Sequence, residues 1–321
     1  MNFQTHIPLE KQNSNQIDYN SKLLLLGSCF VENIGEKFSY FKFQSLQNPF
    51  GILFHPKAIE TLISKAITGY QYSEADIFYH NEQWHCYDAH SRLSNTSKEA
   101  LLLNLNDQLE QISNRLTEAS HIIITFGTAW VYNHYKSNLP VANCHKVPQK
   151  EFIKQLLSAD DIIISINKIE EFIRRINSNT QIIFTVSPVR HIKDGFVENT
   201  QSKAHLIVAI HQFLNHQSSI AVQQSFYFPS YEIMLDELRD YRFYAEDMLH
   251  PNSLAIQYIW EKFKSVWIDS ATDKVMSQVD VIQKGLQHKP FNPHSEAHQK
   301  FLKDLESKQQ RLQQDFPFMT F

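Results

Sequence analysis

A serine that follows a short apolar run is placed where a nucleophile could act. Ser28 lies two residues after the run Leu23–Leu26 and precedes Val31–Phe38, whose pattern predicts a helix. On such a strand-to-helix turn the hydroxyl reaches the edge of a sheet, and the N–H groups that start the helix point the same way. Ser28 is therefore a candidate nucleophile. The alternative is that it only caps the helix, as serine often does.

An aspartate and a histidine near the other end of the sequence could supply the base. Asp247 and His250 lie in a loop that leads into the predicted helix Leu254–Trp267. At this spacing the carboxylate can accept the Nδ1–H of the imidazole, so that Nε2 is free to take the proton of a nucleophile. The alternative is a surface turn in which Asp247 is only a capping residue.

These residues need a sheet to bring them together, and the apolar pattern predicts one. Short apolar runs bounded by turn residues predict buried strands, and amphipathic windows between them predict helices. Their alternation indicates a parallel sheet with helices on both faces. The predicted strands are Leu23–Leu26, Phe41–Leu46, Ile122–Phe126, Ile182–Val186 and Phe226–Phe228, and the predicted helices are Pro56–Thr68, Lys98–Leu116, Lys150–Ile176, Lys203–Leu214 and Leu254–Trp267.

The carboxyl ends of the predicted strands carry the remaining chemistry, because ligands of parallel sheets bind at that edge. Five segments follow strands there, and each holds polar residues or glycine: Gly27–Phe30, Asn48–Gly51, Gly127–Trp130, Ser187–His191 and Asp247–His250. Ser28 follows the first strand and His250 the last, as an active site across one sheet edge requires. The chain has only seven glycines and no glycine-rich phosphate loop.

Six short motifs in one order resemble a known family. They read GSCF from Gly27, NPFGI from Asn48, GTAWVY from Gly127, NCHKVP from Asn143, SPVRH from Ser187 and FYAEDMLHP from Phe243. Together they resemble the GSCFA domain family, within the wider SGNH/GDSL hydrolase superfamily, over roughly the first 268 residues.

The resemblance implies a fold and a set of roles. It implies a flavodoxin-like three-layer α/β/α fold with a parallel sheet of about five strands, Ser28 as nucleophile, and Asp247 and His250 as its partners. In that superfamily the oxyanion is bound by the N–H of the nucleophile, the N–H of a glycine and an asparagine side chain. Ser28 and Gly51 match the first two positions.

Two departures from the superfamily pattern weaken the implied activity. The Gly127–Trp130 block holds no asparagine, so Thr128 or Asn143 would have to replace it, and Gly27-Ser28 lacks the aspartate of the GDS pattern. Losing one oxyanion donor costs about a hundred- to a thousand-fold in rate. We therefore expect slow hydrolysis of a generic ester.

Several other residues are candidates for binding or for rival chemistry. Trp84, Trp130, Asn143, Arg190 and His191 are predicted to contact substrate, although Arg190 and His191 would serve equally in a buried ion pair. Cys29, beside Ser28 at a helix start, is a rival nucleophile.

A metal site is a weaker alternative near Trp84. Cys86, Asp88 and His90 would share one face of an extended segment. Ligands spaced along one strand diverge, and no fourth ligand is evident. We predict no metal and no cofactor.

Composition limits the partners and the compartment. The net charge of −4 and the pI near 6.5 argue against nucleic acid as the main partner. Three cysteines without CxxC spacing indicate a reducing compartment, and we expect the cytoplasm. No window is apolar enough to predict a membrane span, and the four leucines before Gly27 are too few for a signal peptide.

The sequence predicts that the C-terminal segment is a separate extension of the main domain. We divide the chain into residues 1–268 and a helical extension, residues 269–321, with a helix at Ser295–Gln314. Its thin apolar stripe, Phe301, Leu302, Leu305 and Leu312, should dock on the main domain, or alternatively on a second copy to form a homodimer.

The expected function is that of an SGNH-like serine esterase or acyl transferase. O-acyl groups, among them O-acetyl groups of a carbohydrate, are the expected substrates, by analogy with the superfamily. The alternative is a non-catalytic module that binds a glycan or an acylated ligand with Trp84, Trp130 and Arg190.

Overall fold

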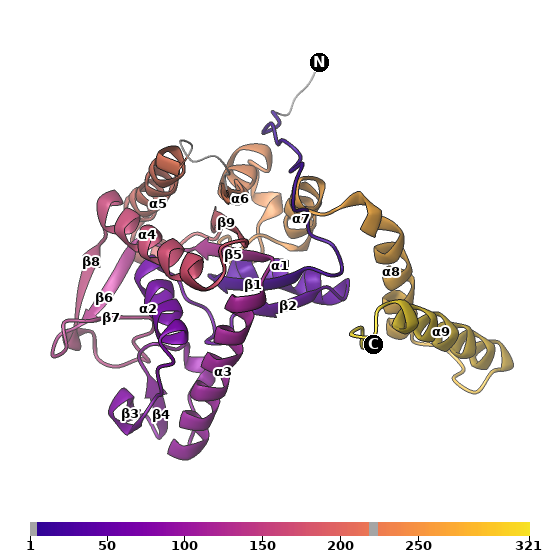
Figure 1. The fold of residues 1–321 in the computed structure, drawn as a ribbon, viewed down its shortest axis with the longest axis horizontal. Coiled ribbons are helices and arrows are strands. Elements are labelled where there is room, and N and C mark those ends of the chain that lie inside the picture. Colours follow the sequence, from indigo (N-terminus) through magenta and orange to yellow (C-terminus); the bar gives the residue numbers. More distant parts are fainter. Residues whose placement is uncertain (1–4, 218–223) are drawn as a thin grey trace.

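A parallel sheet of five strands forms the centre of the protein in a computed structural model, which describes residues 5–217 and 224–321 (Figure 1). The strand order is β10-β9-β5-β1-β2. Numbered along the chain, this is the 2-1-3-4-5 order of flavodoxin-like folds. The strands are β1 (Lys22–Gly27), β2 (Gln44–Gln47), β5 (His121–Phe126), β9 (Gln181–Val186) and β10 (Ser225–Tyr227). The predicted fold class is confirmed.

Helices cover both faces of this sheet and make three layers. One face packs against α2 (Pro56–Ile67), α3 (Lys98–Glu118), α4 (Ala159–Ile176) and α5 (Phe196–Gln217). The other face packs against α1 (Cys29–Tyr40) and α7 (Ser253–Trp267). The short helix α6 (Ser230–Glu232) follows β10.

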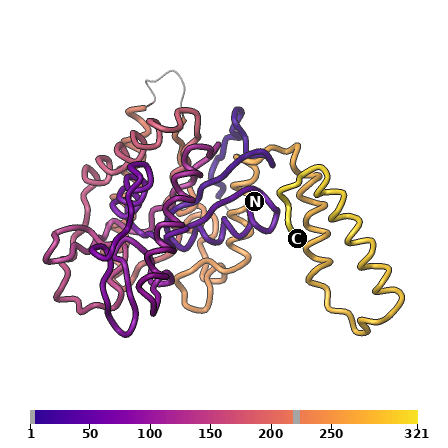
Figure 2. Tube along the Cα trace, turned by 60° about the horizontal axis from the view of Figure 1, so that its bottom comes forward, coloured from indigo at the N-terminus to yellow at the C-terminus, as the bar shows by residue number. Residues whose placement is uncertain are grey.

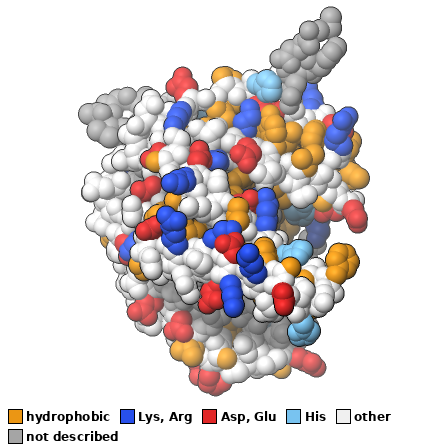
Figure 3. All heavy atoms as spheres, turned by 90° about the vertical axis from the view of Figure 1, so that its right-hand side faces the viewer, with side chains coloured by type: hydrophobic (Ala, Val, Ile, Leu, Met, Phe, Trp, Pro, Cys, Tyr) orange, Lys and Arg blue, Asp and Glu red, His pale blue; other side chains and the backbone are white. Residues whose placement is uncertain are grey.

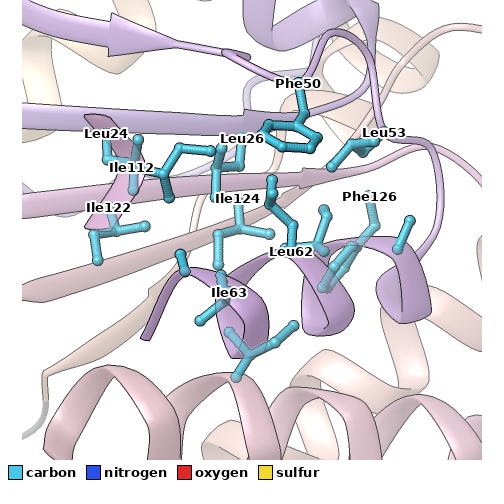
Figure 4. Close-up of a cluster of buried hydrophobic side chains, with 14 of the residues drawn as sticks. Leu24, Leu26, Phe50, Leu53, Leu62, Ile63, Ile112, Ile122, Ile124 and Phe126 are labelled. Carbon is cyan, nitrogen blue, oxygen red and sulfur yellow. The ribbon is translucent and has the colours of Figure 1, made fainter. Parts of the chain in front are cut away.

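The central strands are buried along their whole length because alternate side chains enter opposite layers. On β5, Ile122 and Ile124 belong to the core under α2 to α5, whereas Ile123 belongs to the core under α1 and α7. Figure 4 shows Leu62 and Ile63 of α2 turned toward the sheet residues of the first core. This two-sided burial explains why the strands read as continuous apolar runs.

Two smaller sheets were not predicted. Strands β3 (Ile77–His80) and β4 (Gln83–Cys86) form a hairpin, and β6 (Trp130–His134), β7 (Pro140–Val141) and β8 (Phe152–Leu156) form a three-stranded antiparallel sheet.

Three predicted element bounds were wrong. The predicted helix Lys150–Ile176 begins only at Ala159, because residues 152–156 pair with β6 and a Ser158–Asp161 capping box starts the helix. β2 begins at Gln44 because the chain first turns through Lys42, whose φ is 62°. α5 begins at Phe196, before the predicted start at Lys203.

The C-terminal extension is a pair of helices beside the main body. Helices α8 (Asp273–Gln287) and α9 (Glu296–Asp315) lie side by side at one end of the molecule (Figure 2). Leu305 and Leu312 are buried in the same core cluster as residues of α1 and α7, whereas Phe301 and Leu302 remain 37% and 41% exposed. The extension therefore packs on its own chain.

Polar contacts reinforce this packing. The Tyr40 hydroxyl donates to Asp280 at 2.8 Å, and the Gln283 amide donates to the Tyr40 carbonyl at 2.9 Å. Figure 3 shows acidic and basic side chains interspersed on the side of the molecule from which the extension projects.

None of the helices within residues 5–217 and 224–321 combines the length and the apolar character needed to cross a membrane.

Candidate active site

Ser28 lies where β1 joins α1. The residue occupies the N-cap position with extended backbone angles, but its side chain makes no capping hydrogen bond. Ser28 is fully buried, and Oγ has no hydrogen-bond partner among the described residues. A capping role, the alternative considered from the sequence, is therefore not observed.

Ser28 and His191 lie close together because both border Gly127. A methyl group at Gly127 would lie 3.2 Å from the Ser28 Cβ atom and 3.2 Å from His191 Nε2, so these two atoms are separated by no more than twice that distance. Like the Ser28 hydroxyl, His191 Nε2 is buried and has no partner among the described residues. The three residues follow β1, β5 and β9, at the carboxyl ends of neighbouring strands.

Asp247 and His250 form a hydrogen-bonded pair. His250 Nδ1 lies 2.6 Å from Asp247 Oδ2, and Asp247 Oδ1 accepts the N–H groups of His250 and Leu249 at 3.0 and 2.8 Å. These two backbone donors, with the imidazole, lower the pKa of the Asp247 carboxyl to about 2. The ionised carboxylate can orient the ring, but no hydrogen bond joins His250 to Ser28 in the part of the chain that the structure describes.

One pocket of about 490 Å³ gathers most of the predicted site. Its walls include apolar side chains, among them Phe54 and Leu249, and the charged Lys193 and Asp194. Ser28 does not line it, although the adjacent Cys29 does. The predicted site residues that line it are Thr128, Trp130, Asn143, Arg190, His191 and His250.

Besides Ser28 and Asp247, the predicted residues Trp84 and Gly51 lie outside this pocket. Trp84 is on the β3–β4 hairpin, where its ring packs near Tyr79 and lies under the Lys98 ammonium at 5.9 Å. Gly51 is held against His90, where any side chain would clash, and its φ of 76° suits glycine. Neither position contributes to the pocket wall.

The groups predicted to bind an oxyanion already have partners. The N–H of Ser28 donates to the Thr125 carbonyl at 3.0 Å, which extends the β1–β5 pairing by one residue. The N–H of Gly51 donates to the Asn48 carbonyl at 2.8 Å, and the Thr128 hydroxyl lies 3.0 Å from that of Ser202. In this conformation the two N–H groups are engaged, and the Thr128 hydroxyl pairs with Ser202 and also accepts the N–H of Trp130 at 3.0 Å.

Asn48 is a site residue that the sequence analysis did not single out. Its side chain is buried, and Oδ1 accepts the N–H of Gly27 at 2.9 Å, next to Ser28. Its Nδ2 has no partner among the described residues. The sequence feature that could have identified Asn48 is its position directly after the second strand of the sheet.

Lys203 is the second residue that was missed. It is buried, and Nζ donates to the carbonyls of Gly127 and Ser187, both at 2.7 Å. The ammonium thus ties the ends of β5 and β9 together. Burial lowers the pKa of Lys203 to about 7. The sequence feature that could have identified Lys203 is its helical spacing with Leu206 and Ile210, which places it on the buried face of α5.

The rival nucleophile Cys29 is poorly activated. Burial raises the pKa of its thiol to about 11, against an opposing effect of the Lys203 charge. The thiolate is the reactive form of cysteine, and almost none is present near neutral pH at this pKa.

The alternative roles of two groups are not observed. Asp88 binds Lys65 at 2.7 Å, and no set of three His, Cys, Asp or Glu side chains in the described ranges could hold a metal ion. Arg190 donates to the Tyr244 hydroxyl at 2.9 Å and makes no salt bridge to a carboxylate of the described residues. Its charge therefore remains available at the pocket.

Comparisons with known proteins bear on the family. A solved acetyl xylan esterase from the rumen bacterium Butyrivibrio proteoclasticus is similar with a TM-score of 0.41 and 10% identity, over 84% of this chain and 65% of that one. The chain thus spans less than two thirds of that protein. No curated protein matches. The family model described as the GSCFA family matches residues 22–263, and the model described as the C-terminal domain of GSCFA domain proteins matches residues 279–321. Since the first model alone covers most of the sequence, this chain belongs to the GSCFA family.

Proposed function

We propose that this protein is an SGNH-like serine esterase or acyl transferase that acts on O-acyl groups. The observation that carries the proposal is the Asp247–His250 pair, whose imidazole lines the same pocket as the neighbour of Ser28. A carboxylate-oriented histidine at a pocket that adjoins a buried serine is the arrangement that acyl transfer uses.

The reaction then has two halves. Ser28 Oγ attacks the carbonyl carbon of an ester while His250 Nε2 takes the hydroxyl proton, and the same proton passes to the alcohol that leaves. The acyl group remains on Ser28. In the second half a water molecule or another alcohol gives its proton to His250 and attacks the acyl-enzyme. As the bond from the acyl carbon to Ser28 Oγ breaks, His250 returns that proton to Oγ. Asp247 stays ionised throughout and stabilises the imidazolium.

This mechanism requires Ser28 and His250 to approach when substrate binds. Catalytic hydrogen bonds are often long without substrate and shorten in the complex. A rotation of the Ser28 side chain, which no hydrogen bond holds, is the simplest movement that would contribute.

The pocket suits a small ester with polar parts. Its volume lies within the range of roughly 300–1,000 Å³ that small-molecule sites occupy. Phe54 and Leu249 offer an apolar surface to an acyl chain, and Arg190 and Asn143 offer hydrogen-bond donors to the alcohol part. O-acetylated carbohydrates are the substrates we would test first, by analogy with the superfamily.

Turnover of 4-nitrophenyl acetate and acetylated sugars by Ser28→Ala tests the proposal. We expect kcat to fall at least about a thousand-fold, as when the nucleophile of a triad is removed. Cys29→Ala is the matched control, since it alters the adjacent pocket residue, and it should retain activity. Equal turnover by the wild type and Ser28→Ala would exclude the proposed mechanism.

A non-catalytic module that binds a glycan or an acylated ligand is the second candidate. The observation that favours it is the pairing of all three predicted oxyanion donors within the protein. Such a module would quench or enhance Trp130 fluorescence on binding an acetylated sugar, would turn over no ester, and would bind equally well as Ser28→Ala.

A further inference from the structure

The imidazole of His191 packs against Phe54, with Nε2 beside Gly127. The backbone N–H of His191 donates to Asn199 Oδ1 at 2.9 Å, and its ring meets the ring of Phe54 edge to face at 5.3 Å. Nε2 borders Gly127, as does the Cβ atom of Ser28. The imidazole and the serine therefore lie close together without a substrate.

Nε2 of His191 is buried and has no hydrogen-bond partner within residues 5–217 and 224–321. A buried polar atom without a hydrogen bond destabilises the fold, so it calls for an explanation such as a catalytic role. The Ser28 hydroxyl nearby is unpaired as well. Two such atoms beside one glycine mark a place where a polar atom of a ligand would satisfy both.

The charge state of His191 distinguishes its role from that of His250. Burial, together with positive charge on Lys203 and His250, lowers the pKa of His191 to about 3. At neutral pH the ring is uncharged, so it can donate one hydrogen bond but is a weak base. Phe54, which packs against the ring, carries no charge, so burial is the main cause of this state, and Lys203 and, when protonated, His250 add to it.

We propose that His191 is a further catalytic residue of the esterase reaction: its neutral imidazole donates a hydrogen bond from Nε2 to the carbonyl oxygen of the ester as Ser28 attacks. The proposal rests on the proposed function of Ser28. The proton stays on His191 throughout, the oxygen gains and then loses negative charge, and His250 alone transfers protons.

Three variants test this role by their kinetics. His191→Phe keeps the ring shape without a donor, His191→Gln supplies an amide N–H, and His134→Gln is a control outside the pocket. We expect His191→Phe to lower kcat about a hundred- to a thousand-fold with little change in KM. His191→Gln should stay within about ten-fold of the wild type and keep its acid limb in the pH profile, because His250 still supplies the base.

Three kinetic results would overturn the proposal. They are a His191→Phe variant with wild-type kcat, a His191→Gln variant as slow as His191→Phe, and loss of the acid limb in His191→Gln. Loss of the acid limb in His191→Gln would show that His191 is the base. Melting curves of each variant identify any that fails to fold.

A second readout does not depend on turnover. When a fluorophosphonate phosphonylates Ser28, the phosphoryl oxygen occupies the place of the oxyanion, and the Nε2 proton of His191 should move downfield in the NMR spectrum. An unchanged proton, or a ring protonated on both nitrogens at pH 7, would overturn the proposal. If the wild type neither turns over esters nor reacts at Ser28, the proposed function fails and this role with it. If Ser28 reacts but the His191 variants behave as wild type, only this inference fails.

Discussion

Ser28, Asn48 and His191 each have, at the carboxyl edge of the sheet, a buried polar atom that finds no partner in the described part of the chain. Such atoms lower stability. Active sites commonly carry this kind of cost, because groups that must bind a reacting molecule are left unsatisfied without it. The grouping of these three atoms on the loops that follow β1, β2 and β9 therefore supports a reactive site more strongly than any one of them.

Replacement of Ser28 by alanine should stabilise the fold while it removes activity. The hydroxyl neither caps α1 nor meets another partner among the described residues, so its loss removes an unsatisfied group. We expect a gain of about 1 kcal/mol in the free energy of unfolding, measured by urea denaturation. A loss of more than 1 kcal/mol would show that Ser28 has a structural hydrogen bond.

The chemistry of the site was only partly readable from the residues. Ser28, Asp247 and His250 stood out because each pairs a reactive type with a position at a strand or helix end. Lys203 did not, because a lysine within a helical pattern is ordinarily solvated, and only its alignment with Leu206 marked it as buried. The burial of His191 Nε2 depends on contacts with Gly127 and Phe54, which no local pattern encodes.

At the scale of elements, the central strands of the parallel sheet were predictable from the sequence, and the strands of the smaller sheets were not. Strands β1, β5 and β9 are buried on both faces, so their sequences are continuous apolar runs. Strand β8 has three exposed residues and exists because it pairs with β6. Such pairing joins segments that are distant in sequence, and the apolar period around Lys150 therefore favoured a helix that does not form there.

Lys203 gives α5 a pH-dependent role in joining β5 to β9. Its pKa of about 7 in the folded protein lies below the ordinary 10.5, so the unfolded chain binds more protons between these values. The contribution of this group to stability therefore rises with pH from about 7 to 10.5. Urea titrations at several pH values should show that the wild type gains stability over Lys203→Met across this window.

In part of that pH range the titration of Cys29 changes the stability in the opposite direction. Only the difference in stability between the wild type and Lys203→Met is therefore informative. Its raised pKa makes the folded state bind more protons, which lowers stability as the pH rises. A difference between wild type and Lys203→Met that is constant from pH 7 to 10.5 would contradict the assigned state of Lys203.

At the scale of the whole molecule, the C-terminal extension completes the core on the α1 and α7 side. Leu305, Leu312 and Met319 are all at least 95% buried in that cluster, and Phe316 packs against Tyr19 at 5.1 Å between ring centres. This packing places the extension on the opposite face of the sheet from α2 to α5. Whether the division at residue 268 separates two folding units stays a prediction.

Deletion of residues 291–321 should lower the melting temperature without changing the mass in solution. The deletion removes α9 and exposes the apolar side chains of α8 that it covers, so the remaining fold loses buried area. Differential scanning calorimetry and light scattering on both proteins measure the two quantities. Conversion of a dimer to a monomer would instead assign the extension to an interface between copies.

The most direct test of the central claim is to find which residue becomes covalently modified by a fluorophosphonate. Intact mass and peptide mapping after reaction at neutral pH should show one phosphonyl group, on Ser28, with fluoride released. Ser28→Ala should gain none, and His250→Ala should react far more slowly because no base takes the Ser28 proton. Modification of another residue, or an unmodified protein that still turns over esters, would contradict the account.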